Sequence, residues 1–126
     1  MSKTRATNKR ILLIEDDRSL QIAMRYALED LGYEIVVAGD QAHAASAILD
    51  GPYDAAVVDY FLDNVPASGL IAALRRRYPD IPLVCSTGAC AEQIELEGDL
   101  LRPNAYLYKP FAPEQLRATL NAVLLA

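Results

Sequence analysis

The chain has 126 residues, of which 52% are hydrophobic and 23% are charged, which is typical of one globular domain that buries its own core. The net charge of −5 excludes a surface built for nucleic acid, which needs clustered Lys and Arg. No apolar run approaches the roughly 20 residues of a membrane span, and the two cysteines lack the partners of a zinc site. We expect a flexible tail at residues 1–8 and one cytoplasmic domain at 9–126, without contact to membrane or nucleic acid.

Short apolar runs alternate with amphipathic segments along the chain. The runs are continuous rather than alternating, as in strands that are buried on both faces of a parallel sheet. They lie at residues 11–14, 34–38, 54–59, 81–86 and 105–108. Apolar residues at helical spacing predict helices near residues 20–31, 45–49, 70–78 and 113–124, with a short or irregular element at 89–97.

Five consecutive βα units predict an α/β domain with a parallel sheet between two layers of helices. Right-handed crossovers restrict the topology, and the chain length favours a doubly wound five-stranded sheet of order 2-1-3-4-5. The first apolar run is followed neither by a Gly-rich dinucleotide fingerprint nor by a Walker A sequence. The dinucleotide-binding and P-loop functions therefore lose their main support.

Polar residues collect where the predicted strands end. Glu15 and Asp16 follow the first strand, Asp59 ends the third, Thr87 follows the fourth and Lys109 follows the fifth. In such a sheet these ends meet at one edge, where ligands bind. Crowded carboxylates repel one another, and Mg²⁺ can compensate them. Together with a lysine and a hydroxyl, this set is suited to phosphoryl transfer.

Each of these residues also has a simpler interpretation. Asp17, just before a helix, is most economically an N-cap, and a lone strand-end aspartate such as Asp59 is usually a turn residue. The basic run 75–77 fits the end of a helix, where it complements the helix dipole. The joint occurrence of polar residues at four strand ends nevertheless favours a site.

Over about residues 9–125, the chain resembles the receiver domains of two-component response regulators, including the chemotaxis regulators. "ILLIEDD" is similar to the acidic pocket of that family, with Glu15 and Asp16 as the acidic pair. "AAVVDY" is similar to the phosphoacceptor strand, with Asp59 as the acceptor. The resemblance implies a flavodoxin-like (βα)5 fold.

Two further motifs extend the resemblance. "CSTGA" matches the hydroxyl motif of the family, with Thr87 as the hydroxyl residue. "AYLYKPF" matches the motif of the last strand, with Tyr106 as the aromatic switch and Lys109 as the phosphate-contacting lysine. The family pattern also implies a cis peptide bond between Lys109 and Pro110.

The resemblance implies that Asp59 accepts a phosphoryl group from a phosphohistidine of a histidine kinase or a histidine phosphotransfer protein. It assigns Mg²⁺, for which Mn²⁺ is expected to substitute, to Asp16, Asp59 and the backbone carbonyl of Phe61, with Glu15 acting through water. Phosphorylation would draw in the hydroxyl of the fourth strand and let Tyr106 move, which switches a partner-binding face.

The chain is not expected to be an enzyme beyond Mg²⁺-dependent self-phosphorylation and self-dephosphorylation. In receiver domains, two side chains orient the water that hydrolyses the acyl phosphate, and they correspond here to Phe61 and Ala89. Neither offers a hydrogen bond, so we expect slow self-dephosphorylation. His43 is the only histidine and is interpreted as a surface residue, so the chain is not its own phosphohistidine donor.

One stretch departs from the family pattern. In "DYFLDNVPASG", Asp63 stands where the family commonly has proline, and Gly69 comes ten residues after Asp59. The loop after the third strand is thus expected to be about two residues longer, and it borders the metal site.

Two other functions remain open at this point. A pseudo-receiver that binds partners without phosphorylation would not need the complete set of site residues. A phosphatase of the haloacid dehalogenase type would need Asp-x-Asp after the first strand, which "IEDDR" does not offer in the right register. The chain fits either a stand-alone relay protein or a receiver that is part of a larger protein.

Overall fold

The computed structural model of the chain describes residues 9–88 and 102–125. The strands of its main sheet are β1 (Arg10–Ile14), β2 (Glu34–Ala38), β3 (Ala55–Asp59), β6 (Leu83–Thr87) and β7 (Ala105–Tyr108). The helices are α2 (Arg18–Glu29), α3 (Gln41–Leu49), α4 (Ser68–Arg77) and α6 (Pro113–Leu125). Two short strands, β4 (Phe61–Leu62) and β5 (Val65–Pro66), form a separate hairpin.

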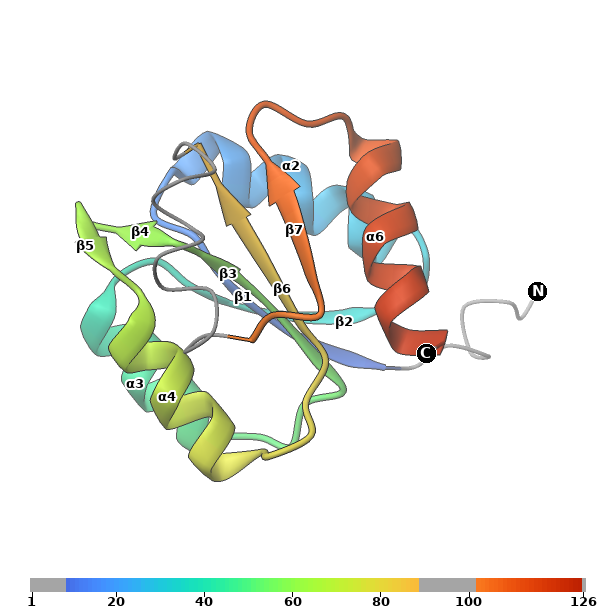
Figure 1. The fold of residues 1–126 in the computed structure, drawn as a ribbon. Coiled ribbons are helices and arrows are strands. Elements are labelled where there is room, and N and C mark those ends of the chain that lie inside the picture. Colours follow the sequence, from blue (N-terminus) through green and yellow to red (C-terminus); the bar gives the residue numbers. More distant parts are fainter. Residues whose placement is uncertain (1–8, 89–101, 126) are drawn as a thin grey trace.

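The five strands of the main sheet are parallel and follow the order β2-β1-β3-β6-β7. This confirms the doubly wound order that the sequence predicts. Helices α2 and α6 cover one face of the sheet, and α3 and α4 cover the other (Figure 1). In this order the first and third strands are neighbours, so their carboxyl ends lie together.

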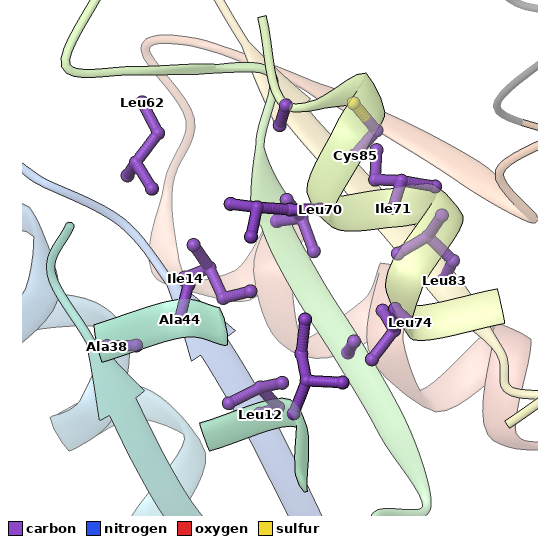
Figure 2. Close-up of a cluster of buried hydrophobic side chains, with 14 of the residues drawn as sticks. Leu12, Ile14, Ala38, Ala44, Leu62, Leu70, Ile71, Leu74, Leu83 and Cys85 are labelled. Atoms are coloured by element: carbon purple, nitrogen blue, oxygen red, sulfur yellow. The ribbon is translucent and has the colours of Figure 1, made fainter. Parts of the chain in front are cut away.

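The core consists of two clusters, one on each face of the sheet. Ile11 and Leu13 of β1 belong to the cluster beneath α2 and α6, whereas Leu12 and Ile14 belong to the cluster beneath α3 and α4. All four are at most 1% exposed. Figure 2 shows the second cluster, in which Leu12 and Ile14 face side chains of α4 such as Leu74. Because helices cover both faces of the sheet, its strands do not alternate between apolar and polar residues. This agrees with the continuous apolar runs in the sequence.

The helix ends agree with the sequence signals. The side chain of Asp17 accepts a hydrogen bond of 3.0 Å from the backbone N–H of Leu20, which confirms it as the N-cap of α2. Gly32 ends that segment with a φ of 91°, a left-handed conformation that glycine adopts without a Cβ penalty. The three arginines of the basic run occupy the last turn of α4, where they complement the helix dipole.

The structure differs from the sequence prediction at the start of one strand and adds to it at one loop. The fourth long strand begins at Leu83 rather than at residue 81, because Pro82 has no N–H to donate, although its carbonyl accepts a 3.0 Å hydrogen bond from Ala56. The loop after β3, for which the sequence predicts only a greater length, forms the β4–β5 hairpin. Its two turn residues, Asp63 and Asn64, have φ of 54° and 62°.

Some predictions lie outside the described residues. They concern the tail at residues 1–8 and the element at 89–97, and with it the position of Ala89. Among the helices that the structure describes, none combines the length and the apolar character needed to cross a membrane.

Two tyrosines close the C-terminal end of α3. The hydroxyl of Tyr53 donates to the carbonyl of Ala47 at 2.5 Å, and the hydroxyl of Tyr78 donates to the carbonyl of Ile48 at 2.6 Å. The two rings meet edge to face with their centroids 5.9 Å apart. Both hydroxyls thus donate to carbonyls of the last turn of α3, of which that of Ala47 also accepts the backbone N–H of Asp50 at 2.9 Å.

Tyr78→Phe should therefore lower the free energy of unfolding by about 1 kcal/mol, because the carbonyl of Ile48 loses its donor while the ring keeps its packing. Urea denaturation measures this change. Tyr26→Phe is the matched control, since Tyr26 is 80% exposed and its stability effect should be negligible. Equal losses in both variants would contradict a capping role for Tyr78.

Candidate functional site

The site lies at the carboxyl edge of the sheet, beside the β4–β5 hairpin (Figure 1). The register that pairs Ile14 with Val58 places the following residues, Glu15 and Asp59, next to each other. Lys109 arrives immediately after β7, and its backbone N–H donates to the carbonyl of Thr87 at 2.8 Å. The structure thus brings together residues of four strands, as the sequence predicts.

Three carboxylates form the centre of the site. Glu15, Asp16 and Asp59 each offer an oxygen, and these oxygens all lie within 4.8 Å of one another. Glu15 is fully buried and Asp59 is 5% exposed, whereas Asp16 is exposed. Three negative charges at this separation repel one another strongly unless positive charge is supplied.

Lys109 supplies one positive charge to two of the carboxylates. Its Nζ lies 3.0 Å from Oε1 of Glu15 and 3.3 Å from Oδ2 of Asp59. Burial works against the ammonium ion, but the hydrogen bond to Glu15 and the charge of Asp59 outweigh it, so that the pKa of Lys109 is raised. The peptide bond from Lys109 to Pro110 is cis, as expected.

Backbone N–H groups supply a second kind of neutralisation. The N–H of Asp17 donates to Oε2 of Glu15 at 3.0 Å, and that of Phe61 donates to Oδ1 of Asp59 at 3.3 Å. The N–H of Asp63, at the tip of the hairpin, donates to Oδ2 of Asp16 at 3.0 Å. Each of the three carboxylates therefore accepts at least one backbone hydrogen bond.

The neutralisation remains incomplete at Asp59. Burial and the charge of Glu15 raise the pKa of Asp59 to about 7, although Lys109 and the N–H of Phe61 act in the opposite direction. At the more open Asp16, burial is outweighed, chiefly by the N–H of Asp63, and the pKa is lowered. The negative charge of the site is therefore not fully compensated, and the excess is centred on Asp59.

This donor set fits a hard divalent cation. Mg²⁺ prefers oxygen ligands and is commonly held by one or two carboxylates, with water completing its shell. Asp16 and Asp59 provide carboxylate oxygens close together, and Asp59 lacks sufficient positive charge around it. The residues present thus match the metal that the sequence predicts.

The two residues predicted to act as a switch lie on the same face of the sheet. Tyr106 pairs in register with Cys85, and Thr87 is two residues further along β6, so the side chains of Tyr106 and Thr87 point toward the layer of α3 and α4. Thr87 is buried. Tyr106 is half-buried and stacks on Tyr108, with ring centroids 6.1 Å apart.

The N–H of Asp63 is the part of the site that the sequence did not indicate. A backbone donor leaves no trace in residue identity, and Asp-Asn is a weaker hairpin signal than Asn-Gly or Asp-Gly. His43 is exposed and contacts the carboxylate of Asp40, in agreement with its interpretation as a surface residue.

Comparison with known proteins gives a consistent family. The family model described as the response regulator receiver domain matches residues 11–121. The phosphate regulon transcriptional regulatory protein PhoB of Pseudomonas aeruginosa is 31% identical over 118 residues, which cover 92% of this chain and 52% of that protein. The chain spans about half the length of the curated relatives it matches.

Solved structures show the same fold. A CheY-like receiver domain protein from Methanospirillum hungatei has a TM-score of 0.86 at 23% identity, covering 93% of this chain and 94% of that one. The receiver domain of the sensor histidine kinase PA1611 from Pseudomonas aeruginosa has a TM-score of 0.84 at 23% identity, covering 94% and 99%. In that structure a magnesium ion is coordinated in the active site cleft.

The raised pKa of Asp59 predicts an unusual pH dependence without metal. Between its ordinary value of 3.8 and about 7, the folded state holds a proton on Asp59 that the unfolded state has released. The free energy of unfolding should therefore fall as pH rises through this range. In Asp59→Asn this contribution is absent, so the variant should gain at least about 1 kcal/mol on the wild type between about pH 4.5 and about pH 7.5.

Urea denaturation in chelator at several pH values tests this. The contributions of Asp16 and Asp40 do not interfere, because their pKa values are lowered and they act mainly below this range. If the free energy of unfolding depended on pH in the same way in both proteins, Asp59 would not be the group whose pKa is raised in the folded state.

Proposed function

The chain belongs to the response regulator receiver family, and from this membership we propose that it is a phosphoacceptor switch of two-component signalling. Asp59 takes a phosphoryl group from a phosphohistidine of a histidine kinase or a histidine phosphotransfer protein. One observation carries the proposal: Nζ of Lys109 contacts both Glu15 and Asp59, and the carboxylate of Asp16 lies beside them. A domain that merely binds partners has no need of this arrangement.

The transfer is an exchange of one bond for another. A carboxylate oxygen of Asp59 attacks phosphorus, the new P–O bond forms as the P–N bond breaks, and the imidazole nitrogen leaves with the electron pair and takes up a proton. Lys109 already lies 3.3 Å from Asp59. It can therefore pair with the phosphoryl group, which adds about −1.5 to −2 charges.

A divalent cation belongs to this proposal. Asp16, Asp59 and the backbone carbonyl of Phe61 would hold Mg²⁺ or Mn²⁺, with Glu15 acting through water. When bound, the ion neutralises the attacking carboxylate and the oxygens of the transferred group. The cluster of carboxylates supports this assignment, as does the magnesium ion in the PA1611 receiver domain.

The switch would run along β6 to β7. Thr87 would donate to the phosphoryl group, and its movement would let Tyr106 change position. The placement of both side chains on one face of the sheet supports this route. The aromatic pair of Tyr106 and the half-exposed Tyr108 would then alter the surface that a downstream protein meets.

The phosphodonor protein would approach beside Lys109. A surface groove of about 570 Å³ lies between α2 and the segment that follows β7, and it is lined by Leu20, Lys109, Pro110 and Phe111 among others. This groove gives a partner apolar contact directly next to the acceptor. Two-component membership implies a histidine kinase as the upstream partner.

Asp59→Asn should abolish phosphorylation, because the amide is nearly isosteric with the carboxylate but is not the required nucleophile. Incubation with acetyl phosphate and Mg²⁺, followed by mass spectrometry, should add one phosphoryl group to the wild type and none to the variant. Asp63→Asn, on the neighbouring hairpin, should remain phosphorylated at Asp59. Stable phosphorylation of Asp59→Asn at another residue would refute the assignment, and no mass addition to the wild type would favour a pseudo-receiver.

Phe61 and Ala89 are proposed to make the acyl phosphate long-lived, because neither side chain can orient a hydrolytic water. Phe61→Asn should accelerate the decay, and Phe61→Asn/Ala89→Glu should accelerate it further, on the order of 10²-fold. The decay of the phosphorylated protein is followed by mass spectrometry, with Phe61→Leu as a control that adds no hydrogen-bonding group. Unchanged decay in both variants would mean that other groups set the lifetime.

A further inference from the structure

The β4–β5 hairpin has one backbone edge directed at the acidic site. The N–H of Ala67 donates to the carbonyl of Tyr60 at 2.7 Å, and Leu62 pairs with Val65, so the even-numbered residues of this leg face β5. Because the N–H and C=O groups of successive residues in a strand point to opposite sides, Phe61 faces away from β5, and Asp63 follows it in the turn. Their N–H groups are the two that reach Asp59 and Asp16.

Two features of the hairpin fix the position of this edge: the buried side chain of Leu62 and the turn at the tip. The side chain of Leu62 is fully buried and reaches the core cluster beneath α3 and α4 (Figure 2). The tip depends on Asp63 and Asn64, both with positive φ, which is the conformation of a two-residue type I′ turn. Asp and Asn tolerate this conformation, whereas a β-branched residue does not.

We propose that the β4–β5 hairpin is a positioning element for the metal site, which holds the exposed carboxylate of Asp16 through the backbone N–H of Asp63. This inference rests on the proposed function of the acidic site. Glu15 and Asp59 are fixed by burial and by Lys109. Asp16 is exposed, and the hairpin tip holds its carboxylate through a 3.0 Å hydrogen bond from the N–H of Asp63, which is the strongest of the hydrogen bonds that lower its pKa.

The geometry of this hydrogen bond suits a supporting role. The N–H of Asp63 engages Oδ2, one of the two carboxylate oxygens of Asp16. A hydrogen bond that restrains a ligating carboxylate from outside lowers the entropy lost when the metal binds, and removing such supports typically weakens metal affinity by about 10- to 100-fold. Because the donor is a backbone group, the hydrogen bond does not depend on the side chain of Asp63. It depends on the conformation of the turn, which directs the N–H.

Substitutions at the turn test the proposal without altering any metal ligand. Asn64→Val disfavours positive φ and should weaken Mg²⁺ binding by about 10-fold or more in calorimetric titration. Asn64→Gly is the matched control, since glycine suits the turn and should retain wild-type affinity. Wild-type affinity in Asn64→Val would overturn the proposal, as would an equal loss in Asn64→Gly.

The proposal requires that Asn64→Val weakens Mg²⁺ binding because it disturbs Asp16, and not because it shifts the carbonyl of Phe61. In an Asp16→Ala background, Asn64→Val should weaken Mg²⁺ binding no further, whereas a second loss of the same size would overturn the proposal. Amide hydrogen exchange of the wild-type protein gives a test that needs no variant. Exchange at Asp63 should stay slow at saturating Mg²⁺, and a large acceleration would show that the metal breaks the hydrogen bond.

The same experiments separate this inference from the proposed function. If the wild type neither binds Mg²⁺ nor accepts phosphoryl from acetyl phosphate, the proposed function fails and the inference fails with it. If the wild type does both while Asn64→Val and Asn64→Gly bind Mg²⁺ with equal affinity, the hairpin proposal alone is wrong.

Discussion

The contact of one ammonium group with two buried carboxylates is the interaction on which this structure depends most. Lys109 follows β7 at one edge of the sheet, whereas Glu15 and Asp59 follow β1 and end β3, and neither of those strands is a neighbour of β7. The ion pairs therefore tie together the carboxyl ends of strands that share no backbone hydrogen bonds. Breaking such a buried contact leaves an uncompensated charge, which is far more costly than losing a surface pair.

The carboxylates of the site are neutralised to different extents. The exposed Asp16 is satisfied by a backbone N–H and keeps a low pKa, whereas the buried Asp59 has a pKa of about 7 despite Lys109. A carboxylate that carries more charge than its surroundings compensate attracts a cation most strongly. The residue proposed as the nucleophile is thus also the one with the greatest demand for further positive charge.

The acceptor and the residues of the proposed switch start from opposite faces of the sheet. Asp59 pairs in register with Ser86, so the two extend toward the same face, which is the layer of α2 and α6. Thr87, the next residue of β6, points to the opposite face together with Tyr106. Under the proposed function, Ser86 and Thr87 at the end of β6 lie between the acceptor Asp59 and the surface that Tyr106 would alter.

The sequence by itself determined the doubly wound sheet, the N-cap of α2 and the residues at the strand ends. Continuous apolar runs indicate strands that are buried on both faces of the sheet. The order of the elements and right-handed crossovers then determine which strand ends meet. The sequence alone therefore predicts that Glu15, Asp16, Asp59 and Lys109 lie close together. Thr87 and Tyr106 followed from the motifs, but only the register of β6 and β7 places them on one face.

Only the tertiary structure decided the form of the loop after β3 and its contact with Asp16. The segment is shorter than any periodic pattern can reveal, and its stability comes from the burial of Leu62 and from two residues with positive φ. Its link to the site is a backbone N–H, which every residue except proline carries. Residue identity therefore holds no information about that hydrogen bond, and the folded path of the chain alone establishes it.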